Sequence, residues 1–177
     1  MRYAVVTGAA AGIGRALARR FGAAGCKVLG IDVDEPAAER TARELAGAGI
    51  DARFLIADLG TPEGVDRVLS EAAAGPPIGV FVHNAGINLV GRFAESDAER
   101  QRAVIELNLT APMVLSAGLL REKRLARGAS LVFVSSLSRF VGYPGAAGYA
   151  ASKDGLASYA RGLATAYAAA GLHVLTV

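Results

Sequence analysis

A tyrosine and a lysine stand four residues apart, at Tyr149 and Lys153, in a stretch that predicts a helix. Side chains at this spacing share one helix face, one turn apart, so the lysine ammonium can lie beside the phenol. A phenol normally ionises near pH 10, and a neighbouring positive charge stabilises its phenolate. The pair is therefore a candidate for proton transfer near neutral pH. The same spacing also arises in helices where both side chains have only structural roles.

Ser135 and Ser136 end an apolar run upstream of this pair. In a proton-transfer site, the Ser136 hydroxyl can hydrogen-bond the substrate oxygen while the tyrosine gives or takes the proton. A serine hydrolase is a poorer interpretation, because the sequence has no Gly-x-Ser-x-Gly elbow and neither His83 nor His173 fits a triad order. We expect His83 to pack at the end of a strand, and we expect no metal site.

A glycine-rich segment, TGAAAGIG at residues 7–14, lies between the first apolar run and the first helical pattern. Glycines at Gly8, Gly12 and Gly14 permit a tight turn, a close approach of backbone to phosphate, and close packing of strand against helix. A loop of this kind at the start of a helix binds the pyrophosphate of a dinucleotide. A plain structural turn is the alternative, and the position between strand and helix favours the nucleotide.

Asp32 ends the second apolar run, about 20 residues after the glycine loop, where a carboxylate can accept hydrogen bonds from an adenosine ribose. A carboxylate there repels a 2′-phosphate, and neither Ala10 nor Ala11 supplies a positive charge for one. The sequence therefore predicts NAD as the cofactor in preference to NADP. A capping or turn aspartate is the alternative, but Asp34 suits that role better.

Asp58 follows the third apolar run, and Asn84-Ala85-Gly86 follows the fourth. Parallel strands end at one edge of their sheet, which is where α/β proteins bind ligands. Both segments can therefore contact the nucleotide. Aspartate, asparagine and glycine are also the usual turn-forming residues, so an ordinary turn explains either segment equally well.

These polar positions need a scaffold, and strands and helices alternate along the chain to provide it. Short apolar runs predict strands at 3–6, 27–31, 52–56, 78–82, 130–134 and 172–177. Helical patterns lie between them at 13–24, 36–47, 62–73, 97–124 and 146–170. Each crossover can be a right-handed β-α-β unit. The sequence therefore predicts one doubly wound α/β domain over residues 1–177, with a parallel sheet of six strands and helices on both faces.

Two local signals refine the predicted helices. The segment Thr61-Pro62-Glu63 has the pattern of a helix start, with a cap, a first-turn proline and a first-turn acid. Pro112 falls inside the helix at 97–124, where it removes a backbone hydrogen bond. We therefore expect a kink near Asn108.

Length, composition and charge exclude several classes of protein. The 177 residues are enough for one core, and a composition that is 53% hydrophobic and 20% charged excludes a disordered chain. The net charge of +3 is spread along the chain, and the arginines at 19–20 and 121–127 are better explained as solvated helix faces than as nucleic-acid sites. We expect no nucleic-acid partner and no membrane span. The single cysteine, Cys26, fits a reducing, cytoplasmic location.

The chain resembles the short-chain dehydrogenase/reductase family, in its single-domain subgroup, through several motifs that stand in one order. They are TGAAAGIG, Asp32, Asp58, Asn84-Ala85-Gly86, Asn108, Ser136 and YAASK at 149–153. The resemblance spans essentially the whole chain. It implies a Rossmann fold and an NAD(P)-linked oxidoreductase that acts on a small-molecule secondary alcohol or ketone.

The same resemblance implies roles for individual residues. Ser136, Tyr149 and Lys153 would form the catalytic set, with Asn108 at a helix distortion that supports a water path to the lysine. Tyr149, Ser136 and Ser138 would contact the substrate. The cofactor would be held by Thr7, Gly8, Gly12, Ile13, Gly14, Asp32, Asp58, Asn84, Ala85, Gly86, Tyr149 and Lys153.

The segment after Ser136 offers further candidates for the substrate pocket. Leu137, Phe140 and Tyr143 stand there by position and suggest a moderately apolar substrate. Arg139 occupies a position where the family often has glycine. It either faces solvent or attracts a carboxylate or phosphate.

The sequence departs from the family pattern by stopping at Val177, in the sixth predicted strand. Family members continue through a substrate-covering loop and helix and one further strand, so we expect the chain to lack them. The alternative function is a non-catalytic dinucleotide-binding protein, or an incomplete fragment of a longer dehydrogenase. The resemblance also implies a homo-oligomer that associates through the helices at 97–124 and 146–170, although their small residues suit packing within one chain equally well.

Overall fold

The computed structural model describes residues 2–139 and 143–177, which form a six-stranded sheet. The strands are β1 (Tyr3–Thr7), β2 (Lys27–Asp32), β3 (Ala52–Ile56), β4 (Ile78–His83), β5 (Leu125–Phe133) and β6 (His173–Thr176). They lie in the order β3-β2-β1-β4-β5-β6, and each neighbouring pair is parallel. This confirms the predicted doubly wound α/β fold.

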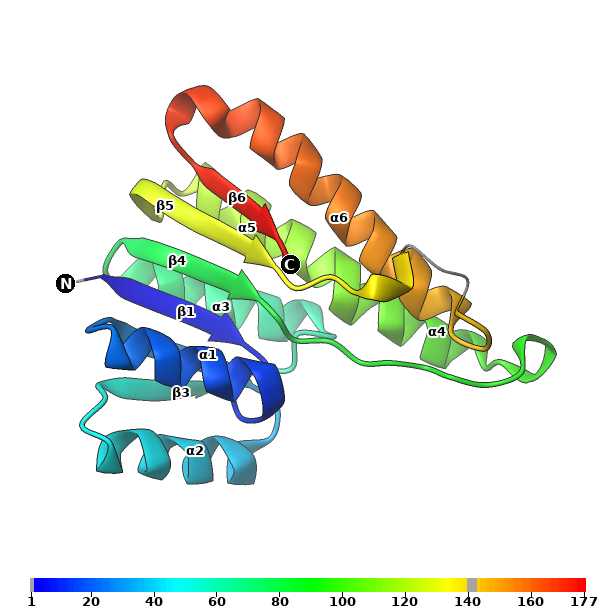
Figure 1. Cartoon of the computed structure of the whole chain (residues 1–177), viewed down its shortest axis with the longest axis horizontal. Helices are drawn as coiled ribbons and strands as arrows, with labels where there is room; N and C mark the ends of the chain where they lie inside the picture. Colours follow the sequence, from blue (N-terminus) through cyan, green and yellow to red (C-terminus); the bar gives the residue numbers. More distant parts are fainter. Residues whose placement is uncertain (1, 140–142) are drawn as a thin grey trace.

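Helices cover both faces of the sheet (Figure 1). They are α1 (Gly12–Ala23), α2 (Glu35–Gly47), α3 (Pro62–Ala74), α4 (Ala98–Ile105), α5 (Ala111–Arg121) and α6 (Ala147–Tyr167). Helices α1 and α2 pack on one face, and α3, α5 and α6 pack on the other. Strands buried on both faces read as unbroken apolar runs, and all five residues of β1 are buried.

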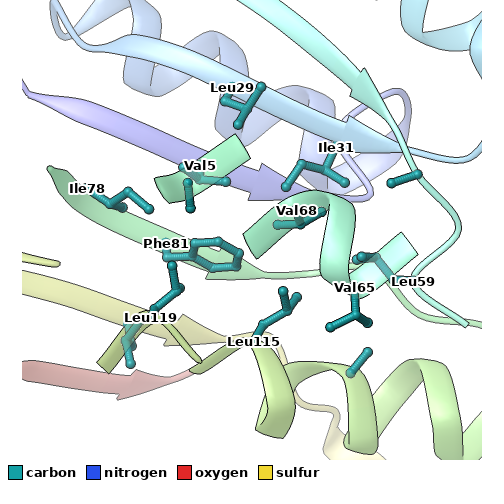
Figure 2. Packing of buried hydrophobic residues seen from close by; sticks show 14 of the residues in the cluster. Val5, Leu29, Ile31, Leu59, Val65, Val68, Ile78, Phe81, Leu115 and Leu119 are labelled. Carbon is teal, nitrogen blue, oxygen red and sulfur yellow. The ribbon is translucent and has the colours of Figure 1, made fainter. Parts of the chain in front are cut away.

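The largest core cluster lies between the sheet and helices α3, α5 and α6. Figure 2 shows Phe81 of β4 between Val68 of α3 and the leucines Leu115 and Leu119 of α5. Phe81, Leu115 and Leu119 are fully buried, and burial of each such side chain contributes about 1.5–3 kcal/mol. This packing fixes the helices that follow β4 and β5.

The predicted helix at 97–124 is interrupted where the kink was expected. A π-helical segment, η2 (Glu106–Thr110), lies between α4 and α5 and contains Asn108. Pro112 has no N–H to donate to the Asn108 carbonyl four residues earlier, so the regular hydrogen-bond pattern cannot continue through this turn. The expected distortion near Asn108 is confirmed.

The same helical run is apolar enough to deserve a comparison with membrane spans. By length and composition alone, Ala98–Arg121 could cross a membrane, with a mean hydropathy of 1.6. Its buried residues Ala111, Leu115 and Leu119 instead belong to the core cluster against the sheet. Packing within the chain thus explains part of the apolar character of the run.

Helix ends and the start of β5 test the local predictions. Thr61 caps α3 by accepting a hydrogen bond from the Gly64 N–H, as predicted. The expectation that the arginines at 121–127 lie on a solvated helix face is wrong for Arg127, which is exposed but lies in β5, and for Arg124. Its guanidinium donates to the Ala72 carbonyl at 2.8 Å and also to the Gly75 carbonyl, at the C-terminal end of α3.

Strand β5 begins earlier than the predicted start at residue 130. Leu125 pairs with Ile78, and the next paired residues are Ser130 and Val80, so the register shifts between them. Gly128 has φ of +72°, which allows the extra residues to bulge out of the ladder. The bulge hides the first part of the strand from a reading of apolar alternation.

Candidate active site and nucleotide site

The ends of β1 and β4 meet at the point where the strand order reverses, and two side chains join their backbones there. The buried Thr7 hydroxyl accepts hydrogen bonds from the N–H groups of Asn84 and Ala85, each at 2.9 Å. The Asn84 side-chain amide donates to the Thr7 carbonyl at 2.9 Å and to the Gly8 carbonyl at 3.2 Å. The predicted residues Thr7, Asn84 and Ala85 are therefore brought together, and the Thr7 hydroxyl shapes the loop from inside.

The glycine loop is packed too closely for side chains at two positions. A Cβ at Gly14 would lie 2.0 Å from the Gly8 carbonyl oxygen, so helix α1 approaches the loop only because residue 14 is glycine. Gly8 has φ of +64°, and a Cβ there would lie 3.0 Å from the Ala85 Cα. Gly12 has φ of +51° and faces open space. The loop therefore needs glycine for contact at one end and for backbone conformation at the other.

The N-terminus of α1 is open to an anion. Ala11 occupies the cap position with no side-chain hydrogen bond, and the first turn contains no acidic residue. The N–H groups of a first turn have no partners within the helix, and they carry the positive end of the helix dipole. Ile13 lies in this turn and is 63% exposed. The segment thus fits the pyrophosphate of a dinucleotide.

Asp32 lies at the end of β2 and is tied into the loop beside it. Its Oδ2 accepts a hydrogen bond from the Ala10 N–H at 2.8 Å, and its Oδ1 accepts one from the Asp34 N–H at 3.1 Å. A carboxylate has about four acceptor positions, so two further hydrogen bonds to a ribose fit. Asp34 caps α2 by accepting from Ala37, as expected from the sequence.

A cavity of about 220 Å³ lies at the ends of β2, β3 and β4. Gly8, Asp32, Asp58, Ala85 and Gly86 are among its lining residues, so the structure brings five predicted cofactor contacts to one hollow. Asp58 itself accepts a hydrogen bond from the Gly60 N–H at 2.8 Å. With the glycine cradle and the open helix terminus, this hollow fits an adenine dinucleotide.

Lys153 is buried in the first half of α6, and only 4% of the residue is exposed. Its Nζ donates to the Val134 carbonyl at 2.9 Å and lies 5.8 Å from the centroid of the Tyr149 ring. Burial lowers the pKa of Lys153 to about 8. The predicted pair therefore shares one helix face, with the ammonium held next to the half-buried phenol ring.

Asn108 links the π-helical turn to the segment after β4. Its Oδ1 accepts from the Ile87 N–H at 2.9 Å, and its Nδ2 donates to the Ile87 carbonyl at 2.9 Å and to the Ser152 hydroxyl at 3.1 Å. A Cβ at Gly86 would lie 3.0 Å from Asn108 Oδ1 and 3.4 Å from Lys153 Nζ. The side chains of Asn108 and Lys153 therefore meet beside Gly86, which lines the nucleotide hollow.

Ser136 follows β5 and is bonded to its own loop. Its hydroxyl oxygen accepts hydrogen bonds from the Ser138 N–H at 3.1 Å and the Ser138 hydroxyl at 2.9 Å. Within the described part of the chain, no hydrogen bond joins Ser136 to Tyr149 or Lys153. The structure thus places the two serines together and leaves the Ser136 hydrogen available to another acceptor.

An apolar hollow of about 510 Å³ opens beside Ser136. Ile13 of the nucleotide loop lines it together with Val134, Leu137 and Val177. Most of the rest of its lining comes from α1, β4, β5 and β6, and neither Tyr149 nor Lys153 is among its described lining residues. Tyr143 is 43% exposed. The pocket candidate Phe140 and the side chain of Arg139 lie outside what the structure describes.

Some residues of the site have no signal in the sequence. The Val134 carbonyl and both backbone groups of Ile87 hold the ammonium and Asn108, and any residue type could supply them. Thr41 of α2 donates to the Ala10 carbonyl at 2.8 Å, although nothing in its neighbourhood in the sequence marks it. His83 behaves as expected, because it is buried between Phe81 and Phe133 at the end of β4.

The chain matches one protein family over nearly its whole length. The family described as short chain dehydrogenase matches residues 2–177. The chain belongs to this family. A relative from Streptomyces exfoliatus, 1-deoxy-11-beta-hydroxypentalenate dehydrogenase, is 40% identical over 98% of this chain and 64% of its own length. The cis-4-hydroxycyclohexanecarboxylate dehydrogenase of Sinomonas cyclohexanicum is 38% identical over 99% of this chain and 71% of its own length.

A solved structure extends the likeness to three dimensions. A candidate NAD(P)-dependent gluconate 5-dehydrogenase from Beutenbergia cavernae, with NADP bound at low occupancy, matches with a TM-score of 0.91 and 38% identity. The match covers 99% of this chain and 70% of that chain. The short-chain dehydrogenase chain described here thus spans less than two thirds of the first relative and somewhat more of the others. The family uses NAD(P), and this neighbour holds NADP although the sequence here predicts NAD.

Proposed function

We propose that this chain belongs to an oxidoreductase that transfers hydride between the nicotinamide of NAD and a secondary alcohol or ketone, with Tyr149 as the general acid and base. The observation that carries the proposal is the position of Lys153. Its buried ammonium lies 5.8 Å from the centroid of the Tyr149 ring. At this place the ammonium, shielded from water, puts a positive charge beside the ring whose hydroxyl would exchange the proton.

The chain's own groups divide the remaining tasks. The Val134 carbonyl fixes the Lys153 ammonium, and below pH 8 that amine keeps its proton. The oxygen of Ser136 already accepts two hydrogen bonds from Ser138, so its hydrogen is free to be donated to the substrate oxygen. Tyr149 gives a proton to the same oxygen during reduction and removes it during oxidation. The bound dinucleotide supplies or accepts the hydride.

The choice of NAD follows from Asp32. Its carboxylate stands where the adenosine ribose would lie, and a 2′-phosphate there would face a negative charge. Ala10 and Ala11 bring no cation to offset that repulsion. The NADP in the Beutenbergia cavernae structure makes this a point to test directly.

We infer the substrate class from the residues beside Ser136 and from the relatives. Val134 and Leu137 flank Ser135 and Ser136 and are apolar, which suits an apolar body around the reacting carbon. The names of the two relatives each denote an alcohol that also carries a carboxylate. We therefore place apolar hydroxy acids and their ketones first in a substrate screen.

The first experiment is a titration of the chain with NADH and NADPH, followed by cofactor fluorescence. We expect tighter binding of NADH, and we expect Asp32→Asn to narrow the difference. A substrate screen with NAD(H) then compares the wild-type chain with Tyr149→Phe, which removes the hydroxyl that would transfer the proton and should lose roughly 10²–10⁴-fold in turnover. Equal turnover in both would contradict the role of Tyr149. Binding without any turnover would favour the alternative of a dinucleotide-binding protein or a fragment.

A further inference from the structure

The peptide groups of Ala10 are held from two sides inside the nucleotide loop. Its N–H donates to Asp32 Oδ2 at 2.8 Å, and its carbonyl accepts from the Thr41 hydroxyl at 2.8 Å. The preceding residue is also fixed, because the Ala9 N–H donates to the Ile31 carbonyl at 3.2 Å. The inner half of the loop is therefore anchored to β2 and α2 before any ligand binds.

Apolar contacts reinforce this anchor. The Ala10 side chain is 4% exposed and packs in a cluster with Ala37 and Ala38 of α2. Thr41 follows one turn later on the same side of α2 and is only 2% exposed. Because Thr41 is buried, its hydroxyl has no bulk water to bond, and the Ala10 carbonyl satisfies it.

The outer half of the loop is free by comparison. Ala11 and Gly12 are exposed, and within the described residues the Ala11 N–H has no hydrogen-bond partner. The Ala10 carbonyl and the Ala11 N–H belong to one planar trans peptide, in which the two groups point in opposite directions. A carbonyl held toward α2 therefore turns the Ala11 N–H away from α2.

We propose that Thr41 is a positioning residue of the dinucleotide site, which orients the Ala11 N–H toward the pyrophosphate by holding the Ala10 carbonyl. The inference rests on the proposed function, because it concerns the loop that would bind the dinucleotide. Asp32 gains a second task, since it restrains the same residue that Thr41 restrains while it also stands beside the ribose. Fixing the loop in advance removes an ordering step from binding.

The test is Thr41→Val, which replaces the hydroxyl with a methyl group of similar size. Loss of one such hydrogen bond should weaken NADH and ADP-ribose binding about fivefold. Adenosine, which has no phosphate, should bind Thr41→Val and wild type equally in a chemical-shift titration. A general loss of stability would not separate these ligands. Thr41→Ser keeps the hydroxyl and should restore NADH binding to within about twofold.

A matched control removes a threonine hydroxyl elsewhere. Thr165 donates to the Arg161 carbonyl within α6, and Thr165→Val should leave NADH binding unchanged. If Thr41→Val does not fold, as judged by circular dichroism, Thr41→Ala carries the comparison, because it removes the hydroxyl together with the γ-methyl group and puts no methyl against the Ala10 carbonyl. If the wild-type chain binds NADH and the Thr41 variants bind it with the same affinity, the positioning role is overturned and the proposed function is not. A wild-type chain that binds adenosine but neither NADH nor ADP-ribose overturns the proposed function and this role together.

Discussion

The Lys153 ammonium lies 5.8 Å from the centroid of the Tyr149 ring, in a position where only 4% of the lysine is exposed. Among the residues that the structure describes, no carboxylate forms an ion pair with this ammonium. A buried charge without a counter-charge destabilises a fold. The position of this ammonium beside the ring therefore lowers the stability of the fold.

The stability of the chain should rise with pH in the alkaline range because of Lys153. Burial lowers its pKa to about 8, whereas the unfolded lysine titrates near 10.4. Between these values the unfolded chain holds a proton that the folded chain has lost, so the free energy of unfolding should increase with pH. The free energy of unfolding, measured with urea between pH 8 and 10, should no longer increase in Lys153→Met. The exposed Lys123, changed to Met, is the control and should keep the increase.

Sequence patterns could locate the two side chains of this pair but not what surrounds them. Their spacing on a helix follows from the residue types alone, and so does the approximate place of the helix. The partner of the ammonium is the Val134 carbonyl. Any residue type at this position would supply the same carbonyl, so the sequence does not mark it. Thr41 is hidden for the opposite reason, since its hydroxyl is informative but its contact with Ala10 depends on how α2 packs on the loop.

Acid should destabilise the chain through His83. This side chain is buried between Phe81 and Phe133 and hydrogen-bonds the Ser116 hydroxyl at 3.0 Å, and burial lowers its pKa to about 3. Below pH 6.5 the histidine of the unfolded chain is protonated, whereas His83 in the folded chain stays neutral until the pH approaches 3. Between pH 6.5 and the lowered pKa of the folded state, this group should therefore decrease the free energy of unfolding by about 1.4 kcal/mol for each unit by which the pH falls.

Urea unfolding at pH 7, 6, 5 and 4 measures this slope. His83→Phe should flatten the profile in that range, even if it lowers stability at pH 7 by leaving the Ser116 hydroxyl without its partner. His173 lies exposed at the start of β6, and His173→Gln should preserve the slope. A wild-type profile that is retained in His83→Phe would show that other groups carry the acid sensitivity.

Two glycines of α6 should respond oppositely to alanine. Gly162 is exposed, and a Cβ there has nothing within 4 Å, so Gly162→Ala should gain up to about 1 kcal/mol from helix propensity. A Cβ at Gly155 would lie 2.9 Å from Leu109 Cδ2, in the π-helical turn that holds Asn108. Gly155→Ala should therefore be less stable than Gly162→Ala by about 1–2 kcal/mol in urea unfolding. Equal gains would mean that Leu109 moves aside freely.

The fold was more predictable than its irregular parts. Strand and helix positions along the chain follow from apolar periodicity, because parallel strands buried on both faces leave a strong signal. The bulge at Gly128 and the contact of Arg124 with the end of α3 break that periodicity or lie outside it. Pro112 is the exception, since a missing N–H is written in the residue type and predicts the distortion at Asn108.

One hydrogen bond joins the two loops that border the chemical end. The Gly91 N–H donates to the Gly145 carbonyl at 2.9 Å, joining the segment after β4 to the segment just before Tyr149. Gly145 has φ of +77°, and a Cβ there would lie 2.8 Å from the Gly91 carbonyl oxygen. Gly145→Ala therefore combines backbone strain with a collision across this joint.

Gly128→Ala separates the two effects, because Gly128 has φ of +72° but nothing within 4 Å of its Cβ position. It should lose only the strain energy, about 1–2 kcal/mol. Gly145→Ala should lose more in urea unfolding and should also speed hydrogen exchange at the Gly91 amide, which Gly128→Ala leaves unchanged. Gly91→Ala places its Cβ in open space and should be tolerated. Equal losses in Gly145→Ala and Gly128→Ala, with unchanged exchange at Gly91, would mean that the two loops are not coupled through this contact.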